Sequence, residues 1–260
     1  MKTLKSNIAS FMIATLFSIT NLNVVAQGLE TRVITGKISD GEHPIVNVAV
    51  TDGQNIVTTD ENGCYSIKTL VNTRFVYITT PAGYVVPVKD KTIPQFYQHL
   101  ETDKNTYDFK LTKNQYNDNN HTFVVHSDVQ VTSMDDINQY KTIIDDCRNT
   151  INKTKGDVFG IDCGDIVGDS PQLYPNYIET VSALKIPFFR AIGNHDMDYY
   201  GRSHETSYKT FEKYFGPTVY SFNKGKAHYI ILNNNFFIGR DYFYMGYVDE
   251  KTFEWLEQDL

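Results

Sequence analysis

The sequence predicts an α/β domain built on a parallel sheet, preceded by a small all-β sandwich domain. Between residues 31 and 113, short β-rich runs alternate with turn pairs such as Asp52-Gly53 and Asn62-Gly63, which is typical of an antiparallel sandwich. After residue 120, apolar strands alternate with segments of helical periodicity, and this order favours a parallel sheet covered by helices. A chain of 260 residues is long enough for both domains.

Residues 1–26 have the features of a secretory signal peptide. Lys2 and Lys5 precede an apolar run over residues 8–19, which is too short to span a bilayer, and we expect a cut after Ala26. The alternative is an uncleaved membrane anchor. We therefore expect an exported protein, periplasmic or extracellular, with no transmembrane segment once the signal is removed.

The composition excludes few partners. The net charge of −7 and the lack of a basic stripe argue against nucleic acid, and the charge itself is explained by solubility. The three cysteines leave at least one thiol free. We expect buried free thiols at Cys64, Cys147 and Cys163, with a Cys147–Cys163 bridge as the alternative.

The all-β domain is expected at residues 30–113. Its runs Gly36-Lys-Ile-Ser-Asp-Gly and Thr59-Asp-Glu-Asn-Gly-Cys-Tyr resemble the carboxypeptidase-regulatory-like sandwich in their turn residues and alternation. The Asn-rich residues 114–120 then suit an exposed linker between this domain and the next one, at residues 121–260.

Residues 121–260 alternate strand and helix patterns. Strands are expected at residues 122–127, 157–161 and 187–192, and a hairpin at residues 219–232. Apolar residues at three- and four-residue steps predict one helix from Ile137 to Ile151 and another around Tyr177 to Leu184. A last helix is capped by Asp249, with Phe253, Leu256 and Leu260 on one face.

Each of the three expected strands is followed by polar residues of metal-binding type. These residues are Asp128 and Gln130, Asp165, and Asn194, His195 and Asp196. Because the carboxyl ends of parallel strands open on one crevice, we expect these side chains to converge. Oxygen and imidazole donors without a thiolate suit Mn, Fe or Zn. Gly164 and Gly193 allow the backbone to turn sharply at the strand ends.

Three motifs carry a resemblance to a known family. Asp128-x-Gln130, Gly164-Asp165-x-x-Gly168-Asp169 and Gly193-Asn194-His195-Asp196 resemble the opening motifs of calcineurin-like metallophosphoesterases, in the family's order. The resemblance covers residues 121–260. It implies an α/β core of βαβ units and a hydrolase of phosphomonoesters or phosphodiesters that uses two divalent metal ions about 3.5–4 Å apart.

The resemblance also implies a role for each residue. Asp128 and Gln130 would bind the first metal, Asp165 would bridge, and Asn194 would bind the second. His195 would face the phosphoryl group and either protonate the leaving oxygen or stabilise charge in the transition state, and Asp196 would orient its imidazole. For Asp169 we expect a structural, hydrogen-bonding carboxylate.

Two departures from the family pattern matter. Position 130 carries Gln where the commoner pattern has His, and Gln is the weaker donor. The family's later His and its Gly-His-x-His motif do not occur in these 260 residues. We therefore expect a fragment with an incomplete core, which binds metal poorly and turns over slowly or not at all.

Other interpretations remain open. A single Asp or Asn after a strand is usually a helix cap. The domain could be a degenerate, non-catalytic phosphoesterase-like protein that binds glycans or cell-surface phosphate polymers, or the sandwich could act as a docking module. For an enzyme, the expected partner is a phosphoester, and Tyr199-Tyr200 with residues 242–244 could wall a pocket for a sugar- or nucleotide-linked one, or simply pack.

Overall fold

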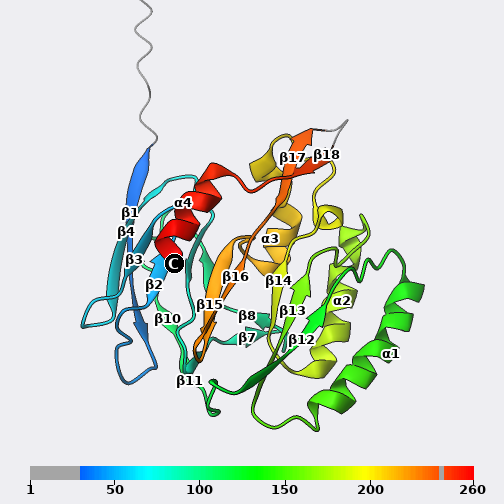
Figure 1. Ribbon diagram of the computed structural model, residues 1–260. Helices are drawn as coiled ribbons and strands as arrows, with labels where there is room; N and C mark the ends of the chain where they lie inside the picture. Colours follow the sequence, from blue (N-terminus) through cyan, green and yellow to red (C-terminus); the bar gives the residue numbers. More distant parts are fainter. Residues whose placement is uncertain (1–29, 240–242) are drawn as a thin grey trace, which may run out of the picture. The chain divides into compact units, whose positions relative to one another are not determined.

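A computed structural model of the protein describes residues 30–239 and 243–260. The predicted signal peptide lies outside these residues. Residues 31–260 form one compact unit (Figure 1). Within the part that is described, no helix has both the length and the apolar character needed to cross a membrane.

A three-stranded parallel sheet forms the centre of the α/β part. Its strands lie in the order β12 (His121–His126), β13 (Asp157–Cys163) and β14 (Phe188–Ala191). Helix α1 (Met134–Ile151) connects β12 with β13, and α2 (Tyr174–Val181) connects β13 with β14. The predicted alternation of parallel strands and helices is therefore confirmed.

Side chains alternate between the two faces of this sheet, as they must in any strand. On β13 and β14, Phe159 and Phe189 pack into a core shared with the N-terminal strands. Their neighbours Val158 and Phe188 pack with α1 and α2 on the opposite face. Figure 1 shows this order, with the N-terminal strands and the two helices on opposite sides of the sheet.

Helix α1 begins where the sequence supplies a complete N-terminal cap. The Ser133 hydroxyl accepts a hydrogen bond from the Asp136 amide, and the Asp136 carboxylate accepts one from the Ser133 amide. Such reciprocal caps satisfy amides that have no partner within the helix. Ile137, Tyr140 and Ile144 then recur on the buried face, as the periodicity predicts.

The N-terminal region contains two larger sheets. One has the order β10-β1-β4 and the other β3-β2-β5-β9, and two short pairs, β11-β6 and β7-β8, complete the region. The strands are β1 (Thr31–Ser39), β2 (Ala49–Thr51), β3 (Ile56–Thr58), β4 (Cys64–Leu70), β5 (Phe75–Ile78), β6 (Tyr84–Val85), β7 (Val88–Lys89), β8 (Ile93–Pro94), β9 (Tyr97–His99), β10 (Phe109–Lys110) and β11 (Thr112–Lys113). The predicted β-rich character is present, while the sandwich resemblance stays a prediction.

The N-terminal strands share their hydrophobic core with the α/β part. The ring of Phe96 lies 4.5 Å from that of Tyr220, and Phe189 stacks on Phe222 at 3.7 Å, within one cluster of buried residues. The linker is also fastened, because Asp118 is buried and accepts a hydrogen bond from the Gly83 amide. The predicted boundary near residue 113 therefore does not separate two independent cores.

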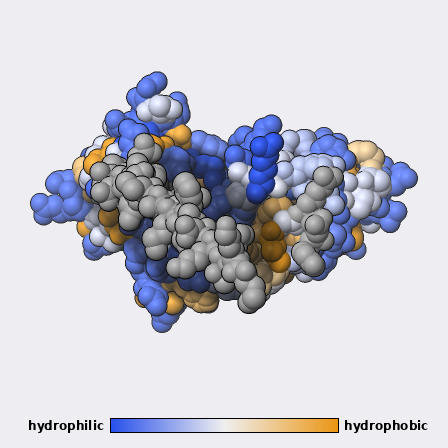
Figure 2. Space-filling model, turned by 90° about the horizontal axis from the view of Figure 1, so that it is seen from above, coloured by the Kyte–Doolittle hydropathy of each residue, from blue (hydrophilic) through white to orange (hydrophobic). Residues whose placement is uncertain are grey.

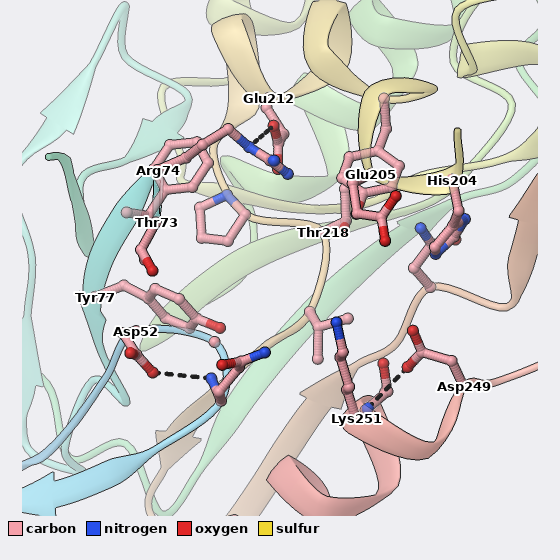
Figure 3. Close-up of a pocket in the computed structure, with 18 of the residues that line it drawn as sticks. Asp52, Thr73, Arg74, Tyr77, His204, Glu205, Glu212, Thr218, Asp249 and Lys251 are labelled. Atoms are coloured by element: carbon pink, nitrogen blue, oxygen red, sulfur yellow. Dashed lines mark hydrogen bonds and ion pairs between the residues drawn. The ribbon is translucent and has the colours of Figure 1, made fainter. Parts of the chain in front are cut away.

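A partly buried ion pair joins the same two regions at the edge of a cavity of about 270 Å³ (Figure 3). Arg74, just before β5, contacts Glu212 on α3 (Lys209–Phe215) through Nε and Oε2 at 2.7 Å. The Arg74 guanidinium also lies over the Tyr208 ring, 5.5 Å from its centroid. Burial raises the pKa of Glu212, and the hydrogen bond and charge of Arg74 oppose that rise.

Two hairpins and a terminal helix complete the fold. The first hairpin, β15 (Tyr220–Lys224) with β16 (Ala227–Ile231), is the predicted one, whereas β17 (Asn235–Gly239) with β18 (Phe243–Gly246) is not predicted by the sequence pattern. Four short 3₁₀ turns lie at Pro171–Leu173, Ser182–Leu184, Asn194–Asp196 and His204–Thr206. On the face shown in Figure 2, hydrophobic residues appear as separate areas on a largely hydrophilic surface.

Helix α4 (Glu250–Asp259) corrects one prediction. Its cap is as expected, since Asp249 accepts a hydrogen bond from the Thr252 amide at 2.8 Å. However, Phe253 and Leu260 are exposed, and Trp255 is the fully buried residue. The indole buries more apolar area than Phe or Leu, and its N–H finds a partner in the Thr51 hydroxyl at 3.2 Å.

The cysteines are all free, so the alternative of a Cys147–Cys163 bridge is wrong. The expected burial is wrong for two of them, because Cys64 and Cys163 are exposed. Cys64 is the first residue of β4 and Cys163 is the last residue of β13, so both lie at strand ends, outside the core.

A row of three ionisable side chains crosses the central sheet in register. His126, Asp162 and Arg190 occupy paired positions on the three strands, and all three are buried. Arg190 Nε lies 2.9 Å from one Asp162 carboxylate oxygen, and His126 Nδ1 lies 3.4 Å from the other. Arg190 also donates a hydrogen bond to the Thr92 hydroxyl, at 2.9 Å. This bond and the contact with Asp162 together offset the cost of removing the guanidinium from water.

Removing the central charge of this row should destabilise the fold strongly. Asp162→Asn leaves the Arg190 charge buried without a counter-ion, and we expect the free energy of unfolding to fall by about 3–5 kcal/mol. Urea denaturation measures it. The matched control is Asp145→Asn, which breaks an exposed pair with Arg148 and should cost about 1 kcal/mol or less. Equal losses in the two variants would contradict a special role for the buried row.

Candidate functional site

The three loops that follow β12, β13 and β14 are joined by backbone hydrogen bonds. The Gln130 amide donates to the Asp165 carbonyl at 2.8 Å, and the Asp169 amide donates to the His195 carbonyl at 3.2 Å. Val131 and Val167 form an isolated parallel bridge between the first two loops. Loops that lie far apart in the sequence therefore meet at one edge of the sheet, as the parallel topology requires.

Three of the predicted site residues meet through their side chains. The Gln130 side-chain amide nitrogen lies 3.0 Å from Asp128 Oδ1 and 3.3 Å from Asp165 Oδ2. Two carboxylates thus converge on one donor, although like charges repel unless something positive lies between them. The amide nitrogen of Gln130 takes the position in which a positive charge would be stabilised.

The backbone of these loops is held in the left-handed region. Of the nine non-glycine residues with positive φ in the described part of the chain, four lie here: Asp128 (53°), Gln130 (43°), Asp165 (50°) and Asp169 (55°). Such conformations cost of the order of 1 kcal/mol or more each and persist where the surrounding structure imposes them. The hydrogen bonds between the loops supply that constraint, and they fix the direction of each carboxylate.

The two glycines have different functions at the strand ends. Gly164 has a φ of +90°, which a side chain rarely tolerates, so it provides the predicted sharp turn. Gly193 has ordinary extended geometry, but a Cβ there would lie 2.0 Å from Asp165 Oδ1 and 2.1 Å from the Asp165 amide nitrogen. Gly193 is therefore required by the close approach of the Asp165 loop.

His195 lies between the carboxylates of the second loop. Its backbone amide donates to Asp165 Oδ1 at 2.9 Å, and its Nδ1 lies 3.1 Å from Asp169 Oδ2. The imidazole is about one-third exposed, which leaves it accessible to a ligand. Asp169, which the sequence presents only as a second Gly-Asp pair after Gly164-Asp165, is the carboxylate that orients this ring.

Asp196 has a different position from the one expected. Instead of contacting the imidazole, its buried carboxylate accepts hydrogen bonds from the amides of Gly193, Ile166 and Val167 and from the Tyr174 hydroxyl. Burial raises the pKa of Asp196 to about 6, while these hydrogen bonds oppose the rise. The expected orienting role of Asp196 is thus corrected, because the side chain points into the loop junction and holds the second and third loops together.

Asn194 opens the short 3₁₀ turn Asn194–Asp196 directly after Gly193 and is half-buried. Its place at the end of β14 puts it on the same edge as Asp165, whose side chain contacts Gly193 and His195. The role of Asn194 as a ligand of the second metal stays a prediction. Tyr174, which sequence reasoning missed, contributes from α2 by holding Asp196.

Within the residues that the structure describes, no group of three or more His, Cys, Asp or Glu side chains is arranged to hold a metal ion. The expected set has only two carboxylates, Asp128 and Asp165, and its other members are the amides Gln130 and Asn194. These oxygens nevertheless fit a hard or borderline divalent cation, since two acidic groups converge on one position. Turning the Gln130 amide by half a rotation would present its oxygen there.

Two depressions flank this site. One, of about 610 Å³, is lined by Asp128, Gln130 and the first turns of α1. The other, of about 640 Å³, is lined by Asp169 and the segment after Met197. The converging carboxylates and His195 therefore lie between two hollows in which the two parts of a larger ligand could be accommodated.

Filling the space above Gly193 should disrupt the site. The added methyl of Gly193→Ala would overlap the Asp165 backbone and carboxylate, and we expect a loss of about 1–3 kcal/mol in the free energy of unfolding. Chemical denaturation measures it, with Gly246→Ala as the control because a Cβ there meets no atom within 4 Å. An unchanged stability for Gly193→Ala would show that the Asp165 loop is free to move.

Comparisons with known families agree with this arrangement. A family model described as calcineurin-like phosphoesterase matches residues 121–258, more than half of the chain. A second, described as the N-terminal of calcineurin-like phosphoesterase, matches residues 32–114. No curated protein and no solved structure matches the chain. The strand-end motifs, their convergence and the match over residues 121–258 lead to one conclusion: the chain belongs to the calcineurin-like phosphoesterase family.

Proposed function

We propose that the protein is an exported, metal-dependent hydrolase of phosphomonoesters or phosphodiesters. The family consists typically of metal-dependent phosphoester hydrolases, which supports the reaction class. The observation that carries the proposal is the convergence of the Asp128 and Asp165 carboxylates on one position, with His195 adjoining through its amide. Export rests on the signal-peptide pattern of residues 1–26 and places the activity in the periplasm or outside the cell.

The residues of the site would divide the binding of two divalent ions between them. Asp128 and Gln130 would hold the first, Asn194 would hold the second, and the Asp165 carboxylate would serve both. When bound, the ions supply Lewis acidity toward the phosphoryl oxygens and lower the pKa of bound water. Mn, Fe and Zn all suit this mixture of carboxylate and amide donors.

His195 acts on the leaving oxygen. Its Nδ1 proton is held by Asp169, so the other ring nitrogen, Nε2, is the atom that exchanges a proton with the substrate. The same contact with Asp169 keeps the ring in one orientation, as a proton donor to the leaving oxygen requires. Asp165 accepts a hydrogen bond from the His195 backbone amide, so the position of the ring relative to the carboxylates is fixed.

A second candidate function follows from Gln130. With an amide in place of a stronger donor and only two carboxylates, the site could retain the fold and bind phosphate-containing glycans or polymers without hydrolysis. We propose accordingly that these 260 residues bind metal weakly and turn over slowly. Metal binding and activity must therefore be measured separately.

Metal binding should depend on Asp165. We expect Asp165→Asn to weaken Mn²⁺ binding by tenfold or more, since it removes the charge that both ions would share, and calorimetric titration of the full chain measures this. Asp145→Asn on the exposed face of α1 is the control and should bind Mn²⁺ like the wild type. Identical affinities for all three proteins would rule out a metal site at Asp165.

Activity should depend on the His195–Asp169 pair. With added Mn²⁺ and chromogenic mono- and diesters, we expect His195→Gln to lower kcat about 10²-fold, the usual contribution of a general acid. Asp169→Asn should lower kcat less, because the ring remains but loses its orientation. Rates that are equal with and without metal, and equal in wild type and variants, would favour the non-catalytic binding protein.

A further inference from the structure

The depression beside Asp169 has the composition of a ligand site, and no role in the proposed chemistry accounts for it. Its volume of about 640 Å³ is large enough for a small organic ligand, for which pockets of about 300–1,000 Å³ are usual. The residues that line it include Asp169, which is the partner of His195, and Met197, which follows His195 by two residues in the chain. A molecule in this depression would contact Asp169, the residue that holds the imidazole of the proposed proton donor.

Two aromatic side chains form part of the wall. Tyr199 and Tyr200 pack edge to face with ring centroids 5.3 Å apart, and Tyr199 is backed by Phe243 at 5.5 Å. Tyr199 is 48% exposed and Tyr200 is 79% exposed, so aromatic surface is turned toward solvent rather than into the core. An exposed, supported aromatic surface suits stacking by a flat ring.

Two cations complete the wall. Arg202 and Lys209 both line the depression and are exposed. Across residues 30–239 and 243–260, neither side chain forms an ion pair with a carboxylate. The carboxylate of Asp198, which also lines the depression, accepts a hydrogen bond from the Thr210 amide at 3.0 Å. The positive charges at this end are thus available to an anionic group.

The loop that carries these residues is held by its own hydrogen bonds. The Gly201 amide donates to the Asp198 carbonyl at 2.8 Å, and the amides of Arg202 and Ser203 donate to the Thr206 hydroxyl, both at 3.0 Å. The backbone under Tyr200 and Arg202 is therefore preorganised, which lowers the entropic cost of binding a ligand.

We propose that this depression binds a nucleoside monophosphate, the leaving group of a pyrophosphate-linked substrate. The inference rests on the proposed function. The base stacks on Tyr199–Tyr200, the phosphate of the leaving group lies at Arg202 and Lys209, and the phosphoryl group under attack lies at Asp165 and His195. Water forms a new O–P bond, the P–O bond to the bridging oxygen breaks, and that oxygen leaves with the electron pair on the nucleoside monophosphate. Of the two water protons, one stays on the new phosphate oxygen, and the other replaces the proton that His195 gives to the leaving oxygen.

The test measures binding separately from catalysis. AMP is titrated calorimetrically into the full chain without metal, beside adenosine, inorganic phosphate and glucose 1-phosphate. We expect AMP to bind more tightly than the other three. Arg202→Gln and Lys209→Gln should each weaken AMP binding about tenfold, as expected for a hydrogen bond to a charged group. Lys213→Gln, on the same helix as Lys209 but away from the depression, should leave it unchanged.

A conservative pair of variants tests the aromatic wall. Tyr200→Leu should weaken AMP binding about fivefold or more, whereas Tyr200→Phe should retain it, because stacking needs the ring alone. Tighter binding of glucose 1-phosphate than of AMP, or AMP affinities that no variant changes, would overturn the assignment. Hydrolysis of chromogenic esters without AMP binding would refute only this inference, and AMP binding without hydrolysis would refute only the proposed enzyme.

Discussion

The buried row of His126, Asp162 and Arg190 is the constraint on which the position of the site depends. Polar and ionisable groups are costly to bury, and these three are accommodated because paired positions on parallel strands place them within reach of one another. Each lies a few residues before a loop of the site. A slip of one residue in either strand pair would separate the charges and would move Asp128, Asp165 and Asn194 away from their common edge.

The loops add a second level of constraint at the surface of the sheet. Asp196 receives three backbone amides and the Tyr174 hydroxyl, and Gly193 permits the contact with Asp165. Left-handed backbone at four acidic or amide positions turns their side chains outward. The site is thus built from strained turns that are held in place by buried polar contacts, an arrangement common where a protein must present charges in a fixed geometry.

Much of this could be predicted from the sequence, for identifiable reasons. Periodicity located α1, α2 and the central strands, and parallel topology implied that the strand-end loops meet. The partner of His195 could not be predicted, because Asp196 adjoins His195 in the chain, whereas Asp169 lies 26 residues away and reaches the ring only through the tertiary structure. The buried face of α4 could not be predicted either. Trp255 is buried there in place of Phe253 and Leu260, and its indole N–H donates a hydrogen bond to Thr51 on a strand far away in the sequence.

The core shared by the N-terminal strands and the central sheet has a consequence for how the molecule can evolve or be shortened. Phe159, Phe189 and Phe222 form a continuous aromatic layer whose covering is supplied by residues from the first third of the chain. Without that covering, the sheet would present this layer to water, and self-association would be the favoured outcome. The N-terminal region therefore completes the core of the phosphoesterase domain, and joining it to another α/β domain would require a matching aromatic layer there.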